Sequence, residues 1–348
     1  MAKTIQDLFD IEFPLIQAPM AGVQTSALAI AVCNAGGLGS LPCAMLSIET
    51  MRAEVAAIRA QTSRPYNLNF FCHAPPLPDA AREARWRAAL APFHAEFGID
   101  PASIAAGPGR APFTHEVADA LEEFAPPVMS FHFGLPPPDL LARVRGWGAK
   151  VLASATTVDE ARWLAERGVD AVIAQGAEAG GHRGMFLGDD IATQIGLFAL
   201  LPQVKRAVDV PVVAAGGIGD AQGVAAALAL GAAGVQIGTA YLLCPEATTS
   251  APHRAALASE AARETALTNV FTGRPARGIM NRVMRELGPM SPAAPAFPLA
   301  TGAMAPLRAK AEAQGSGEFS PLWSGQNASG CKAVPAAQLT RELCALLK

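Results

Sequence analysis

Short apolar runs recur along the chain, and segments with helical periodicity lie between most of them. Most of these runs are continuously apolar, which is typical of parallel strands that are covered on both faces. Strands are predicted at residues 14–18, 37–41, 66–71, 128–133, 150–155, 170–175, 211–216 and 234–238. Helices are predicted at residues 48–61, 79–97, 137–146, 158–167, 191–208 and 221–231. This alternation indicates an α/β fold.

Eight strand–helix units within about 245 residues match the size of a (β/α)₈ TIM barrel. An open, doubly wound sheet is the structural alternative, because eight such units need not close. The Gly- and Pro-rich stretch 97–117 interrupts the third helical layer and predicts a surface excursion. We therefore predict a closed barrel with one insertion in its third crossover.

The pattern changes after residue 244. Residues 255–268 are rich in Ala, Glu and Arg and predict a helix, whereas residues 289–306 carry five prolines and predict no regular element. A terminal helix is predicted to begin near Pro335. The resulting division is a barrel at residues 1–245, a helical and proline-rich lid at 246–320, and a C-terminal segment at 321–348 that packs back on the barrel.

Composition and charge exclude two classes of protein. Hydrophobic residues make up 51% of the 348 residues and charged residues 16%, so the chain can bury a large core and is not disordered. The net charge is -3, and no basic run could neutralise a phosphate backbone. No nucleic-acid partner is expected.

The cysteines and the opening residues bear on location. Six cysteines occur without a C-x-x-C pair, and MAKTIQDLFD carries charges where a signal peptide has an apolar run. We expect a cytoplasmic protein with reduced thiols. The uncharged stretch 221–244 could cross a bilayer, but Gly231, Gly234 and Gly238 divide it into a helix, a turn and a strand. We expect no membrane association. The sequence leaves open whether the protein forms a homo-oligomer.

Candidate chemistry lies at the C-terminal ends of the strands, where barrel enzymes carry their active sites. Glycine-rich turns follow strands seven and eight, at residues 215–219 and 236–239. Backbone N–H groups in such turns can approach a phosphate, and a following helix adds its positive end. A tight turn without any ligand is the alternative for either turn alone.

Two histidines belong to this pattern. His182 lies in AEAGGHRG, where flanking glycines allow a sharp turn that holds an imidazole over the barrel mouth. Ser130 and His132 are two residues apart in a strand, so their side chains share a face and both could reach a polar ligand. A histidine that is only hydrogen-bonded inside the mouth is the alternative for His132.

The sequence shows no residue pattern for metal-dependent or nucleophilic catalysis. No pair among the remaining histidines has metal-ligand spacing, so no metal is expected. G-x-S-x-G is absent, and no cysteine occurs between Cys72 and Cys244. The pattern favours a phosphorylated cofactor that carries the difficult chemistry.

The motifs together resemble those of a known family. QAPMAG, NLNFF, SFHFG, AEAGGHRG, AAGGIG and QIGT, with LWSGQ near the C-terminus, are similar to the nitronate monooxygenases, once called 2-nitropropane dioxygenases. AGGH alone is shared with FMN-dependent enoyl-acyl-carrier-protein reductases. GGHRG together with SFHFG is more particular to the class I monooxygenases.

This resemblance implies an FMN-dependent (β/α)₈ barrel that uses O₂ to convert a nitronate into a carbonyl compound and nitrite, a reaction of nitroalkane detoxification. His182 would be the catalytic base or acid beside the flavin, with His132 and Ser130 near the nitro group of the substrate. The resemblance implies that FMN is held by Ala18, Pro19, Met20, Asn69, Gln175, Gly180, Gly181, Gly216, Gly217, Gln236, Ile237, Gly238 and Thr239.

One departure and two alternatives remain. Class I members often carry tyrosines and a lysine in the lid, but here residues 289–306 contain neither residue type. An NAD(P)H-dependent FMN reductase of enoyl thioesters or quinones is the first alternative. A cofactor-free barrel, acting as a sugar-phosphate isomerase or a phosphate-binding module, is the second.

Overall fold

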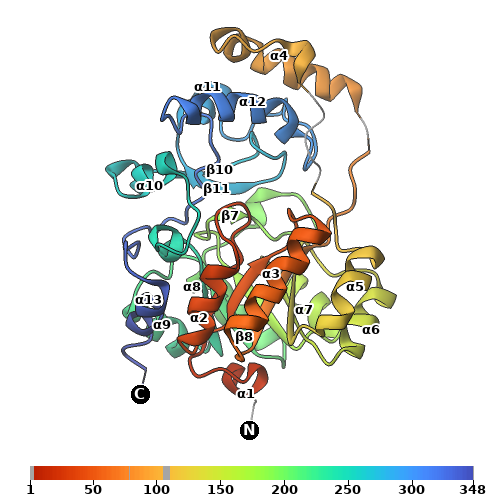
Figure 1. Ribbon diagram of the computed structural model, residues 1–348, viewed down its shortest axis with the longest axis vertical. Coiled ribbons are helices and arrows are strands. Elements are labelled where there is room, and N and C mark those ends of the chain that lie inside the picture. Colours follow the sequence, from red (N-terminus) through yellow and green to blue (C-terminus); the bar gives the residue numbers. More distant parts are fainter. Residues whose placement is uncertain (1–3, 78, 105–109, 348) are drawn as a thin grey trace.

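The computed structural model describes residues 4–77, 79–104 and 110–347, and Figure 1 shows a barrel with a cap above one end. The barrel strands run in parallel in the order β1-β9-β8-β6-β5-β4-β3-β2. Their bounds are β1 (Leu15–Gln17), β2 (Gly39–Pro42), β3 (Tyr66–Phe71), β4 (Val128–His132), β5 (Lys150–Ala155), β6 (Ala171–Gln175), β8 (Val212–Ala215) and β9 (Gly234–Ile237). Each lies within two residues of its predicted position.

The two ends of this sheet meet and nearly close the barrel. The backbone N–H of Leu38, just before β2, donates to the carbonyl of Leu15 at 2.8 Å, and the N–H of Gln17 donates to the carbonyl of Leu38 at 2.9 Å. The predicted (β/α)₈ TIM barrel is therefore confirmed, and the open doubly wound sheet is excluded.

A ring of helices covers the strands. Its members are α2 (Ser26–Asn34), α3 (Ile48–Gln61), α5 (His115–Leu121), α6 (Pro138–Gly146), α7 (Val158–Glu166), α8 (Leu197–Ala207), α9 (Ala221–Ala229) and α13 (Ala336–Leu343). The C-terminal helix α13 packs against both α2 and α9 and so fills the eighth helical position (Figure 1). It begins after Pro335, as predicted.

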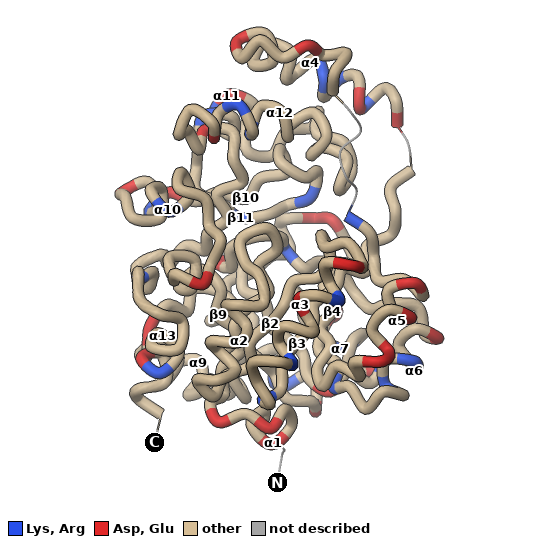
Figure 2. The backbone as a smooth tube through the Cα atoms, viewed as in Figure 1, with Lys and Arg blue, Asp and Glu red and all other residues tan. Residues whose placement is uncertain are grey.

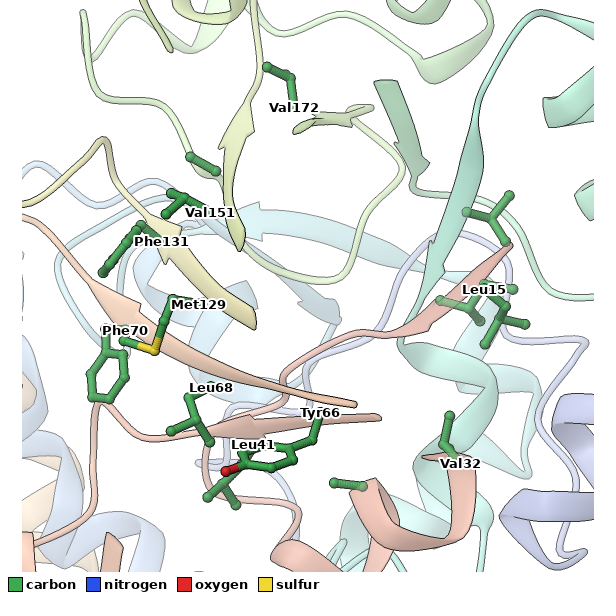
Figure 3. Close-up of a cluster of buried hydrophobic side chains, with 14 of the residues drawn as sticks. Leu15, Val32, Leu41, Tyr66, Leu68, Phe70, Met129, Phe131, Val151 and Val172 are labelled. Atoms are coloured by element: carbon green, nitrogen blue, oxygen red, sulfur yellow. The ribbon is translucent and has the colours of Figure 1, made fainter. Parts of the chain in front are cut away.

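The core has a layer on each side of the strands. Figure 3 shows side chains such as Leu68, Met129 and Phe131, which fill the layer between strands and helices. A second cluster lies inside the barrel, where the short helix α1 (Ile5–Phe9) adds Ile5 and Phe9 at the N-terminal end. This end of the barrel is thereby closed, and the opposite end is left for a site.

The cap covers the C-terminal ends of the strands. Its elements are α4 (Ala80–Glu96), β7 (Gly181–His182), α10 (Ala251–Leu257), β10 (Thr265–Thr268), β11 (Ala276–Ile279), α11 (Arg282–Leu287) and α12 (Ala300–Ala313). Strands β10, β11 and β7 form an antiparallel sheet that the sequence pattern did not predict. The domain boundaries at residues 245 and 320 stay predictions.

Helix α4 lies in the cap, although it follows β3 in the chain and was predicted within the barrel crossovers (Figure 1). Its Trp86 is buried against α12, and the indole Nε1 donates to the carbonyl of Ala300 at 3.1 Å. The barrel position of the third crossover is taken by α5 instead. The predicted excursion at residues 97–117 thus includes the return from the cap, and residues 105–109 of it lie outside the described part.

Two predictions for the cap were wrong. The helix predicted at residues 255–268 ends at Leu257, because Thr265 to Thr268 pair with β11 and this pairing overrides the local helical propensity. The proline-rich segment is not wholly irregular, since α12 begins at Ala300 and contains Pro306. Packing of Ala303, Met304 and Leu307 in the cap core offsets the hydrogen bond that Pro306 cannot donate.

Charged residues lie mainly on the outside. Figure 2 shows Lys and Arg interspersed with Asp and Glu along the outer helices and the cap. Among the described residues, no helix combines the length and the hydropathy needed to cross a membrane.

Candidate active site

A cavity of about 1340 Å³, partly open to solvent, lies between the C-terminal ends of the strands and the cap. Every predicted site residue lines it, although these residues come from separate strand ends and loops. They are Ala18, Pro19, Met20, Asn69, Ser130, His132, Gln175, Gly180, Gly181, His182, Gly216, Gly217, Gln236, Ile237, Gly238 and Thr239. The fold thus brings the predicted residues together in one place.

His182 lies on β7, where its pairing with Ala276 of β11 fixes the backbone over the barrel mouth. Gly181 has a φ of +71°, a left-handed conformation that favours glycine and turns the chain into β7. The ring Nε2 lies 2.9 Å from the hydroxyl of Thr272. Burial, with smaller contributions from nearby cations such as Arg110, lowers the pKa of His182 well below its usual value. The imidazole is therefore neutral at pH 7.

Aromatic rings form one wall around His182. The ring centroids of Phe297, Trp323 and Phe133 lie 5.4, 5.6 and 6.0 Å from that of the imidazole. Phe71 packs against both Phe133 and Phe297 in the same cluster. This wall is apolar and keeps water from the histidine on that side.

His132 is held at both ring nitrogens. Its Nε2 lies 3.2 Å from the carbonyl oxygen of His182, and its Nδ1 lies 3.1 Å from the hydroxyl of Ser154. A carbonyl only accepts, so Nε2 carries the proton and Nδ1 accepts from Ser154. Burial lowers the pKa of His132 to about 3. In this arrangement His132 supports the backbone of His182.

Ser130 is the centre of a small polar network. Its Oγ accepts hydrogen bonds from the side-chain amides of Asn67 and Asn69, at 2.9 and 3.0 Å. The hydroxyl hydrogen of Ser130 remains to be donated, and the residue lines the cavity. A bound ligand could accept that hydrogen.

Gln175 joins the end of β6 to β7. Its Nε2 donates to the carbonyl of His182 at 3.0 Å, and its Oε1 accepts from the N–H of Gly184 at 2.8 Å. The fully buried Arg183 donates to the carbonyls of Gln175 and Gly176, both at 2.7 Å. These bonds fix the loop that carries the histidine.

The glycine-rich turns after β8 and β9 are shaped by their contacts. Gly216 and Gly217 have φ values of +116° and +71°, which favour glycine. The segment that contains LWSGQ closes over them: Gly325 donates its N–H to Thr239 Oγ1 at 2.9 Å, and Asn327 donates to the carbonyl of Gly217 at 3.0 Å. Such a cradle of backbone near two strand ends suits a phosphate.

Gln236 supplies a further sign of a ligand. Its side-chain Oε1 is buried and has no hydrogen-bond partner among the described residues, although the residue lines the cavity. A buried acceptor of this kind normally finds a donor. The imide N–H of a flavin could donate to Gln236 Oε1, and the phosphate of a flavin nucleotide could accept from the backbone cradle. The residues present therefore fit FMN.

Several lining residues escaped the sequence analysis. Arg110 lies outside every motif that was noted, whereas Phe71 lies within NLNFF and Trp323 within LWSGQ, and neither of these two residues was given a role. Thr272, the partner of His182, comes from the cap and carries no local signal. Within the described ranges, no group of three or more His, Cys, Asp or Glu residues could hold a metal ion.

Comparison with known proteins agrees with this geometry. A family model described as nitronate monooxygenase matches residues 2–345. The chain belongs to the nitronate monooxygenase family. The resemblance found in the motifs is thereby confirmed, and membership of this family indicates an oxidoreductase enzyme.

Relatives cover nearly all of the chain. A nitronate monooxygenase of Paraburkholderia phytofirmans is 43% identical over 98% of this chain and 94% of its own length. One of Pseudomonas aeruginosa is also 43% identical, over 99% and 98%. The structure of a nitroalkane oxidase from Streptomyces ansochromogenes, at 40% identity, covers 99% of this chain and 98% of its own with a TM-score of 0.90. The similarity to the family therefore includes both barrel and cap.

Proposed function

We propose that this protein is an FMN-dependent nitronate monooxygenase that uses O₂ to convert alkyl nitronates into carbonyl compounds and nitrite. The observation that carries the proposal is the neutral, aromatic-walled His182 in the same cavity as a backbone cradle fit for phosphate. Family membership supports the reaction class.

The proposed FMN contacts are the lining residues at the strand ends. The turns at Gly216 to Gly217 and Gly238 to Thr239 would hold the phosphate, and the Gln236 amide would pair with the flavin ring. Ala18, Pro19, Met20, Asn69, Gln175, Gly180, Gly181 and Ile237 would complete the cofactor site. FMN would supply electron transfer between nitronate and O₂.

The proposed role of His182 rests on its free nitrogen. When Nε2 donates to Thr272, Nδ1 is an unprotonated acceptor, with no hydrogen-bond partner among the described residues. In this tautomer it would take the α-proton of a neutral nitroalkane. In the other tautomer Thr272 donates to Nε2, and Nδ1 carries a proton that it would donate to an oxygen of a bound nitronate. Ser130 would donate its hydroxyl hydrogen to a nitro oxygen, and His132 would hold His182 in place.

Replacement of the histidine tests this role. His182→Asn should lower kcat/KM for an alkyl nitronate by about a hundredfold, the usual contribution of a positioned acid or base. O₂ consumption and nitrite release measure the rate. His115→Asn, at an exposed position where the ring Nε2 lies 3.0 Å from a carboxylate oxygen of Asp139, is the matched control and should keep full activity. Full turnover of nitronate and nitroalkane by His182→Asn would overturn the assignment.

The cofactor is tested by the visible spectrum of the purified protein without oxygen. We expect a flavin band that an alkyl nitronate changes and NADH leaves alone. Bleaching by NADH with no response to nitronate would favour the reductase. The absence of a flavin band, with none regained on adding FMN, would favour the cofactor-free barrel.

A cytoplasmic location is also proposed. All six cysteines are free thiols, and burial raises the pKa of each of them. Reduced, protonated thiols are typical of a reducing compartment.

A further inference from the structure

The cavity contains one permanent charge. Among the lining residues that the structure describes, Arg110 is the single Lys, Arg, Asp or Glu side chain. No carboxylate forms an ion pair with it within the described ranges. The lining of the site is therefore net positive.

Arg110 is held in place by neutral groups. Its Nη1 donates to the hydroxyl of Thr301 at 3.1 Å, and Thr301 in turn donates to the carbonyl of Phe271 at 3.1 Å. The guanidinium carbon lies 5.6 Å from the centroid of the Phe297 ring. A guanidinium has five N–H donors, so this arrangement fixes its position and leaves donors for a ligand.

Phe297 contacts both Arg110 and His182. The centroid of the Phe297 ring lies 5.6 Å from the guanidinium carbon of Arg110 and 5.4 Å from the centroid of the His182 imidazole. The backbone cradle for phosphate lies elsewhere in the cavity, at the ends of β8 and β9. Arg110 thus lies near the proposed reacting histidine, and no contact between Arg110 and the phosphate cradle occurs among the described residues.

A partly buried cation without a counter-ion is costly, and an anionic ligand offsets that cost. Burial accordingly lowers the pKa of Arg110, although the guanidinium stays charged. A nitronate is an anion with two oxygens on one nitrogen, a shape that the fork of a guanidinium can bind. The parent nitroalkane is neutral and would gain less from the same contact.

We propose that Arg110 is a specificity-determining residue that selects the anionic nitronate over the neutral nitroalkane. This inference rests on the proposed function, because it assigns a substrate form to the same site. His182 then acts on a substrate whose charge Arg110 has already neutralised, and the aromatic wall excludes competing water.

The test uses the flavin-loaded enzyme with three substitutions. Arg110→Met removes the charge and keeps an apolar stem, and Arg110→Lys keeps the charge. Arg263→Met is the matched control, since Arg263 is an exposed cation that pairs with Glu260 and does not line the cavity. Calorimetry measures binding of nitrate, a planar oxyanion of nitrogen, and steady-state kinetics give kcat/KM for a nitronate and for its nitroalkane.

Arg110→Met should weaken nitrate binding and lower kcat/KM for the nitronate by about tenfold or more, as expected for a lost charge-assisted contact. The value for the nitroalkane should change less than about threefold, and Arg110→Lys should recover much of the loss. Equal nitrate binding by wild type and Arg110→Met, or an equal loss on both substrates, would overturn the inference. A wild type that binds nitrate through Arg110 but oxidises neither substrate would overturn the proposed function alone.

Discussion

Thr272 contacts His182 from the loop between β10 and β11. Its hydroxyl is 2.9 Å from Nε2 and the side chain is buried. If Nε2 carries the proton, Thr272 fixes the tautomer in which Nδ1 can accept. A buried ring without this partner could adopt either tautomer, so Thr272 would be a positioning residue.

We predict that Thr272→Val lowers kcat for a nitronate by about tenfold with little change in KM, because the imidazole of His182 is no longer held in one tautomer. Thr272→Ser retains the hydroxyl and should restore most of the rate. Both constants are measured from pH 5 to 9. If the Val and Ser variants have the same rate and pH profile, Thr272 is only a packing residue.

The sequence predicted the residues of the cavity better than their partners. His182 and the glycine turns are recognisable because local chain geometry requires glycine next to them. Thr272 is 90 residues from His182, and the contact depends on the pairing of β7 with β11. Arg110 likewise reaches the cavity only because the chain returns from the cap, which local patterns do not encode.

At the scale of elements, α4 and α12 form the core of the cap. Trp86, Leu90 and Phe93 of α4 lie in one buried cluster with Met304 and Leu307 of α12. The ion pair between Arg282 and Glu96 connects α4 to α11 at the edge of this cluster. Phe93 also packs against Phe319, with ring centroids 5.3 Å apart, and His94 Nε2 lies 2.9 Å from the carbonyl oxygen of Ala303 in α12.

Trp86→Ala should therefore destabilise the cap by about 3–5 kcal/mol, the usual range for removing a large buried aromatic side chain. We expect a lower unfolding midpoint in thermal denaturation and faster proteolysis within residues 72–115. Phe198→Ala, which removes a side chain that is 76% exposed on the barrel, is the matched control and should leave both unchanged. Unaltered proteolysis of the Trp86 variant would show that α4 does not depend on this contact.

Elements were predictable where one local pattern decided them. The barrel strands are continuous apolar runs, and all eight were found. Helix α2 was not predicted, because it is buried on most sides and its residues lack an amphipathic period. Strand β10 was mistaken for a helix because only its pairing with β11 distinguishes it.

At the scale of the whole molecule, buried histidines link stability to pH. Burial lowers the pKa of His73 and His253 to about 4 and that of His132 to about 3. In the unfolded chain these histidines have ordinary pKa values near 6.5. Below that pH the unfolded chain therefore binds protons that the folded chain does not bind. The free energy of unfolding is thus not reduced by these histidines above about pH 6.5, and it decreases as the pH drops from there toward 4.

His253→Gln should flatten this decline, because Gln cannot titrate and its amide can still donate to the carbonyl of Trp323, now bonded to His253 at 3.1 Å. Urea denaturation between pH 4.5 and 7.5 measures the free energy of unfolding at each pH. His115→Asn, at an exposed position, is the control for histidine number. A variant whose slope against pH equals that of wild type would contradict the link for His253.

The position of α4 in the chain has a consequence for synthesis. Trp86 and its acceptor Ala300 are separated by 214 residues. At ordinary rates of translation, roughly 10 to 40 s pass between the emergence of the two from the ribosome. During that interval the apolar face of α4 lacks α12, its main partner, and is exposed to chaperones. The core of the cap can therefore assemble only after every barrel strand has been made, and only α13 of the barrel is made later.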